Sequence, residues 1–213
     1  MYIEPRQKGG SCIEFSQKKL PIGIENFAKL QAEDFYYVDK TMLIKELLDN
    51  WAEVNLFTRP RRFGKSMAAN MLAAYYDRSE NIEELFRNLA ISKDSSYKEN
   101  LNQYDVIKIN MQEFLSMSGT MEEMLEMLKK YLVLDFEETY PQVRFRDEKN
   151  LIQVMKDVFS YTRCPFVILI DEWDCLFREY KQDKEAQKKY LDFLRAWLKD
   201  KDYVALAYMT GIL

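Results

Sequence analysis

The sequence predicts an α/β domain of three layers, in which a mainly parallel sheet is covered by helices on both faces. Short apolar runs alternate along the chain with longer segments whose apolar residues recur at helical spacing, which is typical of strand–helix–strand units. The run from Phe166 to Glu172, FVILIDE, is apolar until two acids end it, the pattern of a strand buried on both faces. With 213 residues, 47% of them hydrophobic, the chain can build one substantial core.

Four strands are expected, at Val54 to Thr58, Tyr104 to Met111, Phe166 to Glu172 and Tyr203 to Thr210. Because ligands of parallel sheets bind beyond the carboxyl ends of the strands, the residues that follow these runs are the first candidates for a site. The intervening helices are expected to bury apolar stripes, which comprise Leu43, Ile44, Leu47, Leu48 and Trp51; the small residues of Met67 to Tyr76; Met121, Met124, Leu125, Leu128 and Leu132; Leu151, Ile152, Met155, Val158 and Phe159; and Tyr190, Leu191, Leu194, Trp197 and Leu198.

A phosphate-binding loop is predicted where the first strand meets a helix. The stretch from Glu53 to Ser66, EVNLFTRPRRFGKS, passes from the strand through a turn and closes on Gly64-Lys65-Ser66. Such a junction presents backbone N–H groups and the positive end of a helix dipole to an anion. Gly-Lys-Ser ends the Walker A pattern G-x-x-x-x-G-K-[ST], although Arg59 stands where the first glycine belongs. Arg59 in place of glycine is expected to limit how closely the loop folds over the β-phosphate, because a Cβ penalises positive φ.

The acidic strand supplies a second motif, because it delivers Asp171 and Glu172 at the carboxyl edge of the sheet. Two carboxylates there suit Mg²⁺ binding and activation of a water molecule. The alternative is a core strand that happens to end in acids, with an unrelated Gly-Lys-Ser turn elsewhere. The order of the two motifs favours a nucleotide site.

Composition excludes several classes of chemistry. The chain has no histidine, so Ser-His-Asp and Cys-His nucleophilic sites, His-based zinc sites and imidazole bases are excluded. Its three cysteines, Cys12, Cys164 and Cys175, lack metal-site spacing and are expected to be reduced thiols. A net charge of −4 argues against broad nucleic-acid binding by the domain. Within this acidic domain, a local cationic spot suits the binding of phosphate; it consists of Arg59, Arg61, Arg62 and Lys65.

Residues 1–19 are polar and aperiodic and are expected to be a flexible lead-in to a domain over residues 20–213. Neither a signal peptide nor an apolar run long enough to span a membrane is evident, which predicts a cytoplasmic protein. The sequence stops at Leu213 directly after a strand that is expected to be buried. We therefore expect a longer protein that continues beyond this point.

Four segments together resemble the bacterial AAA-ATPase-like family. They are LPIGIENFAKLQAEDFYYVDKT from Leu20, FTRPRRFGKS from Phe57, FVILIDEWD from Phe166 and MTGIL from Met209. The resemblance implies a P-loop NTPase fold of the additional-strand type, with the Tyr203 to Thr210 strand between the P-loop strand and the acidic strand. It also implies a further strand, a helical lid and a PD-(D/E)xK nuclease-like domain beyond Leu213. A substituted first Walker glycine is a feature of that family.

The resemblance implies an Mg²⁺-dependent ATP hydrolase in which Lys65 neutralises phosphate charge, Asp171 acts on Mg²⁺ through water and Glu172 polarises the attacking water. Thr210 would orient that water, and Asn110 would hold Glu172 in check, although each of these two residues also reads as an ordinary strand end. The expected catalytic residues are thus Lys65, Glu172, Thr210 and Asn110; the nucleotide-binding residues are Arg59, Pro60, Arg61, Arg62, Phe63, Gly64, Lys65, Ser66 and Met67; and the metal ligands are Ser66 and Asp171.

The triplet Asp39-Lys40-Thr41 has two interpretations. Asp39 or Thr41 would cap the next helix while Lys40 is solvated, or the segment would lie near the adenine, as it does in related ATPases. Besides ATP, the candidate partners are nucleic acid, through a C-terminal domain, and further copies of the chain, with no membrane. The alternative functions are a nucleotide-responsive interaction module that regulates an attached nuclease without turnover and, more remotely, a small-molecule kinase.

Overall fold

A four-stranded, all-parallel sheet forms the middle layer of the computed structural model, which describes residues 18–50, 52–79 and 83–212. Its strands lie in the order β1-β4-β3-β2, with β1 at Val54–Thr58, β2 at Asp105–Asn110, β3 at Phe166–Asp171 and β4 at Val204–Gly211. All four predicted strands are confirmed to within two residues at each end. The last strand lies between β1 and β3, as expected.

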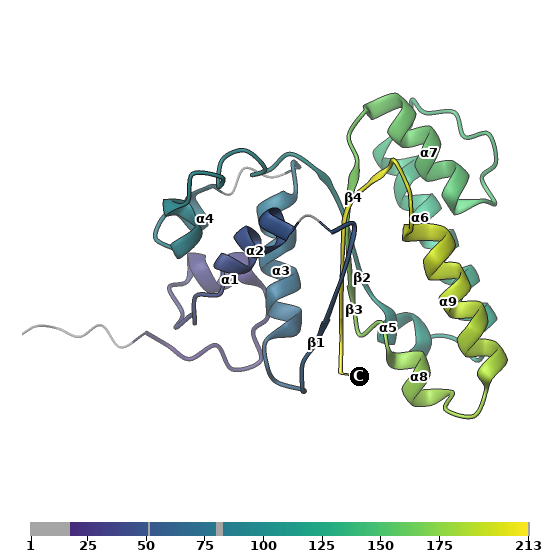
Figure 1. The fold of residues 1–213 in the computed structure, drawn as a ribbon, viewed down its shortest axis with the longest axis horizontal. Coiled ribbons are helices and arrows are strands. Elements are labelled where there is room, and N and C mark those ends of the chain that lie inside the picture. Colours follow the sequence, from purple (N-terminus) through teal and green to yellow (C-terminus); the bar gives the residue numbers. More distant parts are fainter. Residues whose placement is uncertain (1–17, 51, 80–82, 213) are drawn as a thin grey trace, which may run out of the picture.

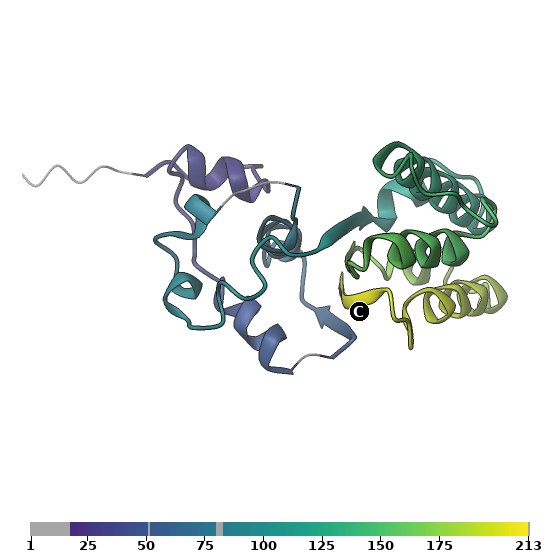
Figure 2. The same ribbon diagram turned by 90° about the horizontal axis from the view of Figure 1, so that it is seen from above.

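Helices cover both faces of the sheet, as Figures 1 and 2 show. One face carries α1, α2, α3 and α4, at Phe27–Ala32, Met42–Asn50, Lys65–Tyr76 and Glu83–Phe86, together with the 3₁₀ helix η1, Ala90–Lys93. The other face carries α5, α6, α7, α8 and α9, at Met111–Ser116, Met121–Thr139, Leu151–Thr162, Cys175–Glu179 and Lys184–Leu198. The predicted three-layer α/β architecture is therefore confirmed.

Two apolar cores result, because the side chains of β3 point alternately to the two faces. Phe166, Ile168 and Ile170 pack with α6, α7 and α9, whereas Val167 and Leu169 pack with α3 and the aromatic residues around it. All six residues of β3 are buried, which is why its sequence is apolar throughout rather than alternating. The central position of β3 holds its carboxyl end, and the acids there, in a fixed place.

The helical stripes are mostly buried as predicted, with one departure among the described residues. Trp51 lies outside the described residues, so its burial stays a prediction. Leu191 is 40% exposed and lies on the side of α9 toward the edge strand β1. There Leu191, Val54 and Leu56 line an open apolar groove of about 530 Å³. Periodicity finds the apolar stripe of a helix but does not show how far the sheet extends beneath it.

The sheet register brings the carboxyl ends of the strands together. Asn110 of β2 lies opposite Asp171 of β3, and Thr58 of β1 lies opposite Gly211 of β4. The loop after β1 and the starts of α5 and α8 lie at this same end of the sheet, at the bottom of Figure 1. Within the part of the chain that the structure describes, no helix is long and apolar enough to cross a membrane.

Candidate functional site

The loop that joins β1 to α3 folds without needing glycine at its first position. Positive φ occurs at Arg62, at 67°, and at Gly64, at 75°, but not at Arg59. Arg59 therefore carries no positive-φ penalty in this conformation, and its effect on how closely the loop folds over a phosphate stays a prediction. The Arg59 N–H donates to the Gly211 carbonyl at 3.1 Å, which fixes the loop to the end of β4.

Lys65 begins α3 and reaches back across this loop. Its Nζ donates to the Pro60 carbonyl at 3.3 Å, and the residue is only 9% exposed. Among the described residues no carboxylate forms an ion pair with Lys65. A nearly buried ammonium that is balanced only by a carbonyl dipole favours an anion as its partner.

Three predicted site residues meet at the Asp171 carboxylate, each from a different element. Ser66 Oγ on α3 donates to Asp171 Oδ2 at 2.5 Å, and Thr210 Oγ1 on β4 donates to Asp171 Oδ1. The Glu172 N–H donates to the same Oδ1 at 2.9 Å. Asp171 is 8% exposed and Thr210 is fully buried, so this arrangement is held firmly.

The donor set at this point fits Mg²⁺. The ion prefers oxygen ligands and is usually held by one or two carboxylates or hydroxyls while phosphate oxygens and water complete its coordination. Ser66 and Asp171 supply a hydroxyl and a carboxylate at one point, beside the loop that carries Lys65. The two predicted metal ligands thus lie together. The Thr210 hydroxyl, which was expected to orient a water molecule, donates to Asp171 in this structure.

Glu172 follows β3 in the left-handed region of backbone space, with φ at 52°. Its Oε2 accepts a hydrogen bond from Arg178 Nη2 at 2.6 Å, and both side chains are largely shielded from solvent. Burial by itself lowers the pKa of Arg178, but the hydrogen bond to Glu172 and the charge of Asp174 outweigh it and raise that pKa. No sequence motif pointed to Arg178.

Asn110 acts as a helix cap in this structure. Its Oδ1 accepts from the Gln112 N–H at 3.0 Å at the start of α5, which favours the plain reading of a polar residue at a strand end. Among the described contacts, the partner of Glu172 is Arg178 rather than Asn110. A role for Asn110 toward Glu172 stays a prediction.

The other predicted loop residues are mostly exposed to solvent. Arg61, Arg62 and Pro60 are exposed, and Phe63 is 59% exposed. Arg59 is also exposed, while Met67 is half-buried in the first turn of α3. None of the three arginines forms an ion pair with a described residue, so their charges remain available at the open side of the loop.

A cavity of about 280 Å³ opens beside Ser66 and Asp171. Its far wall is built by a hydrogen-bonded chain that the sequence did not reveal: Lys108 Nζ donates to Asn70 Oδ1 at 2.6 Å, and Asn70 Nδ2 donates to the Glu25 carbonyl at 2.7 Å. These residues come from β2, α3 and the segment before α1, so no local spacing could have linked them.

The Asp39-Lys40-Thr41 segment contacts two neighbouring parts of the chain, η1 and the loop between β1 and α3. The Asp39 carboxylate accepts from the Thr41 N–H at 2.9 Å and from the Ala90 N–H at 2.7 Å, so it joins the start of α2 to η1 and is not only a helix cap. Lys40 Nζ donates to the Phe63 carbonyl at 3.2 Å. Lys40 is exposed, as the helix-cap interpretation expects, but it also contacts the loop between β1 and α3.

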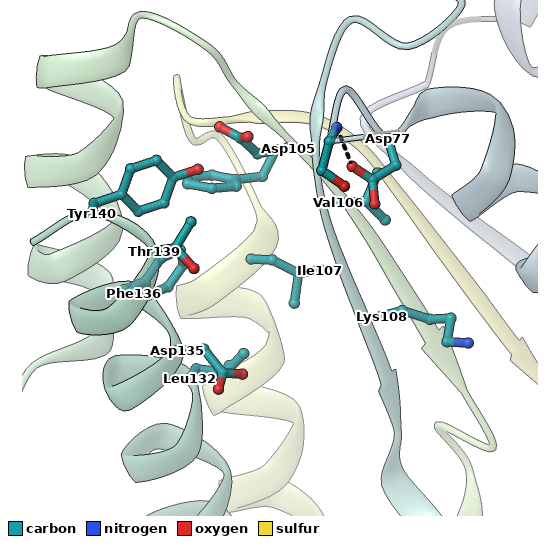
Figure 3. A pocket seen from close by; sticks show the side chains of 12 residues that line it. Asp77, Asp105, Val106, Ile107, Lys108, Leu132, Asp135, Phe136, Thr139 and Tyr140 are labelled. Carbon is teal, nitrogen blue, oxygen red and sulfur yellow. Dashed lines mark hydrogen bonds between the residues drawn. The ribbon is translucent and has the colours of Figure 1, made fainter. Parts of the chain in front are cut away.

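A larger cavity of about 380 Å³ lies away from these residues, along β2 and α6. Figure 3 shows Ile107 pointing toward Phe136 and Tyr140, while Lys108 points to the opposite side of the strand. Asp105 in this cavity is held by Arg78 through two hydrogen bonds of 2.7 and 2.8 Å. The cavity brings none of the predicted site residues together.

Comparisons with known proteins agree with the motifs. An uncharacterized protein encoded in the vnfD 5′ region of Azotobacter chroococcum mcd 1 is 28% identical to this chain over 207 residues. The alignment covers 92% of this chain and 38% of that relative, so the chain spans well under half the length of the relative. No solved structure matches the chain significantly.

A family model described as Predicted AAA-ATPase matches residues 21–213. This range contains β1 and its loop, the acidic strand β3, and β4 with Thr210. The chain therefore belongs to the AAA-ATPase-like family.

Proposed function

We propose that this domain binds ATP and hydrolyses it with the help of Mg²⁺. The observation that carries the proposal is the meeting of Ser66, Asp171 and Thr210 beside a loop whose lysine has no carboxylate partner among the described residues. These residues come from α3, β3 and β4 and are far apart in the sequence. A purely structural cluster would have no need of an adjacent nearly buried ammonium.

In this proposal the loop binds the phosphates. The backbone N–H groups of residues 61–66 and the N-terminus of α3 face the anion, and Lys65 neutralises charge on the β- and γ-phosphates. When bound, Mg²⁺ would neutralise the charge that develops on the phosphate oxygens. Ser66 and Asp171 would hold the ion, Asp171 through water, with Thr210 keeping the carboxylate oriented.

Glu172 is the proposed residue that polarises the attacking water, because its carboxylate directly follows β3 and lies at the same edge of the sheet. Phosphoryl transfer depends mainly on positioning and on charge stabilisation. A single well-placed carboxylate therefore suffices, and no histidine is required. The arginines at positions 59, 61 and 62 are proposed to attract the polyphosphate at the open side of the loop.

The family resemblance extends the proposal to the whole protein. Hydrolysis would power or regulate a nuclease-like domain beyond residue 213, and nucleic acid or further copies of the chain would be the partners. The second candidate is a nucleotide-responsive module without turnover. The ion pair between Glu172 and Arg178 favours this candidate, because it occupies the carboxylate that hydrolysis would need.

Measurement of phosphate release separates the two candidates. We expect Mg-ATP turnover by the parent protein and at least a tenfold loss of turnover in Glu172→Gln, which keeps the shape of the side chain but removes its charge. Glu179→Gln is the matched control, because Glu179 is an exposed glutamate near the same turn. Equal turnover in the parent and Glu172→Gln would remove Glu172 from the mechanism, and ATP binding without turnover would favour the regulatory module.

A further inference from the structure

Arg178 places a guanidinium directly on the carboxylate that is proposed to polarise water. Its Nη2 lies 2.6 Å from Glu172 Oε2, and the two side chains are 17% and 24% exposed. At this distance and degree of shielding the hydrogen bond is charge-assisted and stronger than a surface pair. The negative charge of Glu172 is therefore largely neutralised in this conformation.

Two further groups fix the position of Arg178. Gln112 on α5 accepts from the same Nη2 at 3.3 Å, and Asp174 Oδ1 lies 3.7 Å from Nη1. Asp174 is fully buried and accepts from the Ile212 N–H at 2.9 Å. The guanidinium is thus held between α5 and the turn after β3, and Asp174 ties that turn to Ile212, the residue after β4.

The contact with Asp174 allows the Glu172 side chain to rotate away while the Arg178 guanidinium keeps a second acidic neighbour. If the Glu172 side chain turns away, the guanidinium still lies 3.7 Å from the Asp174 carboxylate and keeps its hydrogen bond to Gln112, so the desolvation cost of an unpaired charge is lowered. A carboxylate that is to polarise water must have a free oxygen lone pair and its full charge. The pair with Arg178 engages only Oε2, but it neutralises much of the carboxylate charge and holds Glu172 against α8, so it opposes the productive arrangement.

We propose that Arg178 is a positioning residue that holds Glu172 in an inactive arrangement and limits the rate of ATP hydrolysis. The proposal rests on the proposed function, because it assigns a regulatory state to the same site. A purely structural ion pair would contribute to stability and leave turnover unchanged when broken. A cation that acts on the phosphates would lower turnover when removed, so the three roles predict three different outcomes.

The test measures Mg-ATP affinity by calorimetry and turnover by phosphate release in the parent, Arg178→Gln and Arg178→Lys. We expect Arg178→Gln to raise kcat about 10-fold, the factor that corresponds to about 1.4 kcal/mol, with the Kd for Mg-ATP changed less than about twofold. Arg178→Lys keeps a cation near Glu172 and should stay close to the parent. Circular dichroism confirms that each variant is folded.

Two controls isolate the pair. Arg195→Gln removes an arginine that pairs with Asp192 on the exposed face of α9, 3.0 Å away, and should leave kcat unchanged. The double variant Arg178→Gln/Glu172→Gln should lose the gain, because the gain acts through Glu172. An unchanged or lower kcat in a folded Arg178→Gln that still binds Mg-ATP would overturn the proposal. Absence of Mg-ATP binding by the parent would instead overturn the proposed function and this inference with it.

Discussion

Thr210→Val tests whether the hydroxyl of Thr210 holds Asp171 in place. Thr210 is fully buried, and its Oγ1 donates to Asp171 Oδ1. Valine has nearly the same shape and suits a strand, so the main loss is one hydrogen bond to a charged group, worth about 1.5 to 3 kcal/mol. For a domain of this size, that loss corresponds to a fall in Tm of roughly 3 to 12 °C.

The functional consequence follows from the same contact. After the substitution, Asp171 keeps Ser66 and the Glu172 N–H as partners, but one side of the carboxylate loses its donor. We expect the Mg²⁺-dependent part of ATP affinity to fall about 10-fold, measured by calorimetry with Mg-ATP and with ATP in EDTA. Thermal and urea unfolding measure the change in stability.

Thr210→Ser is the matched control, because it keeps the hydroxyl and removes only a methyl group. Its cost should be about 1 kcal/mol, in the range found for deleting one buried methyl, with Mg-ATP affinity close to that of the parent. The reasoning would be refuted if Thr210→Val were as stable as the parent within about 0.5 kcal/mol and bound Mg-ATP equally well. A loss of kcat alone, with stability and affinity intact, would point to a water-orienting role.

Three further substitutions test other contacts. In Gly211→Ala the new Cβ would lie 2.8 Å from Asp174 Cγ and Trp173 Nε1, so unfolding experiments should show a loss of stability of about 1 to 3 kcal/mol. The control Gly119→Ala should cost less stability, because its new Cβ meets only the end of the Glu123 side chain. Burial alone would raise the pKa of Asp157, but hydrogen bonds from Arg146 and Gln153 outweigh it and lower that pKa. This stabilisation is therefore present above the unfolded pKa of about 4 and is lost as the pH falls through the lowered folded pKa. Asp157→Asn should thus be less stable than the parent at pH 7. In urea titrations at pH 3 the difference in unfolding free energy between the two should be smaller. Lys40→Ala removes the donor to the Phe63 carbonyl and should weaken Mg-ATP binding a few-fold in calorimetry, whereas Lys45→Ala, at a lysine that pairs with Asp49 and Asp94, should not.

Much of the fold was predictable because its strands carry strong local signals. The apolar runs that contain Val167 and Val204 bury their side chains on both faces, as strands between two layers of helices do. The Gly-Lys-Ser turn and the acids after β3 were likewise visible as motifs, and the parallel register brings them to one edge of the sheet. Local sequence therefore sufficed to predict the convergence of Ser66 and Asp171.

The remaining contacts depend on how distant elements pack, so the sequence does not reveal them. Arg178 reaches Glu172 because α8 turns back immediately after β3, and Lys40 reaches Phe63 across a separation of 23 residues. Neither pair has a regular spacing. Thr210 was expected to orient the attacking water, and this role stays a prediction; the sequence did not reveal that its hydroxyl donates to Asp171, a contact that arises because β4 lies beside β3.

Calorimetric titration of Mg-ATP into the parent protein and into Lys65→Ala tests the central claim most directly. Lys65 is nearly buried, and within the described part of the chain its ammonium donates only to the Pro60 carbonyl. We therefore predict saturable binding to the parent and at least a 10-fold weaker affinity in a folded Lys65→Ala. Lys199→Ala, at an exposed lysine beyond α9, should bind as the parent does. Equal affinity in the parent and Lys65→Ala, or no binding by a folded parent, would contradict the assignment of this loop as a phosphate site.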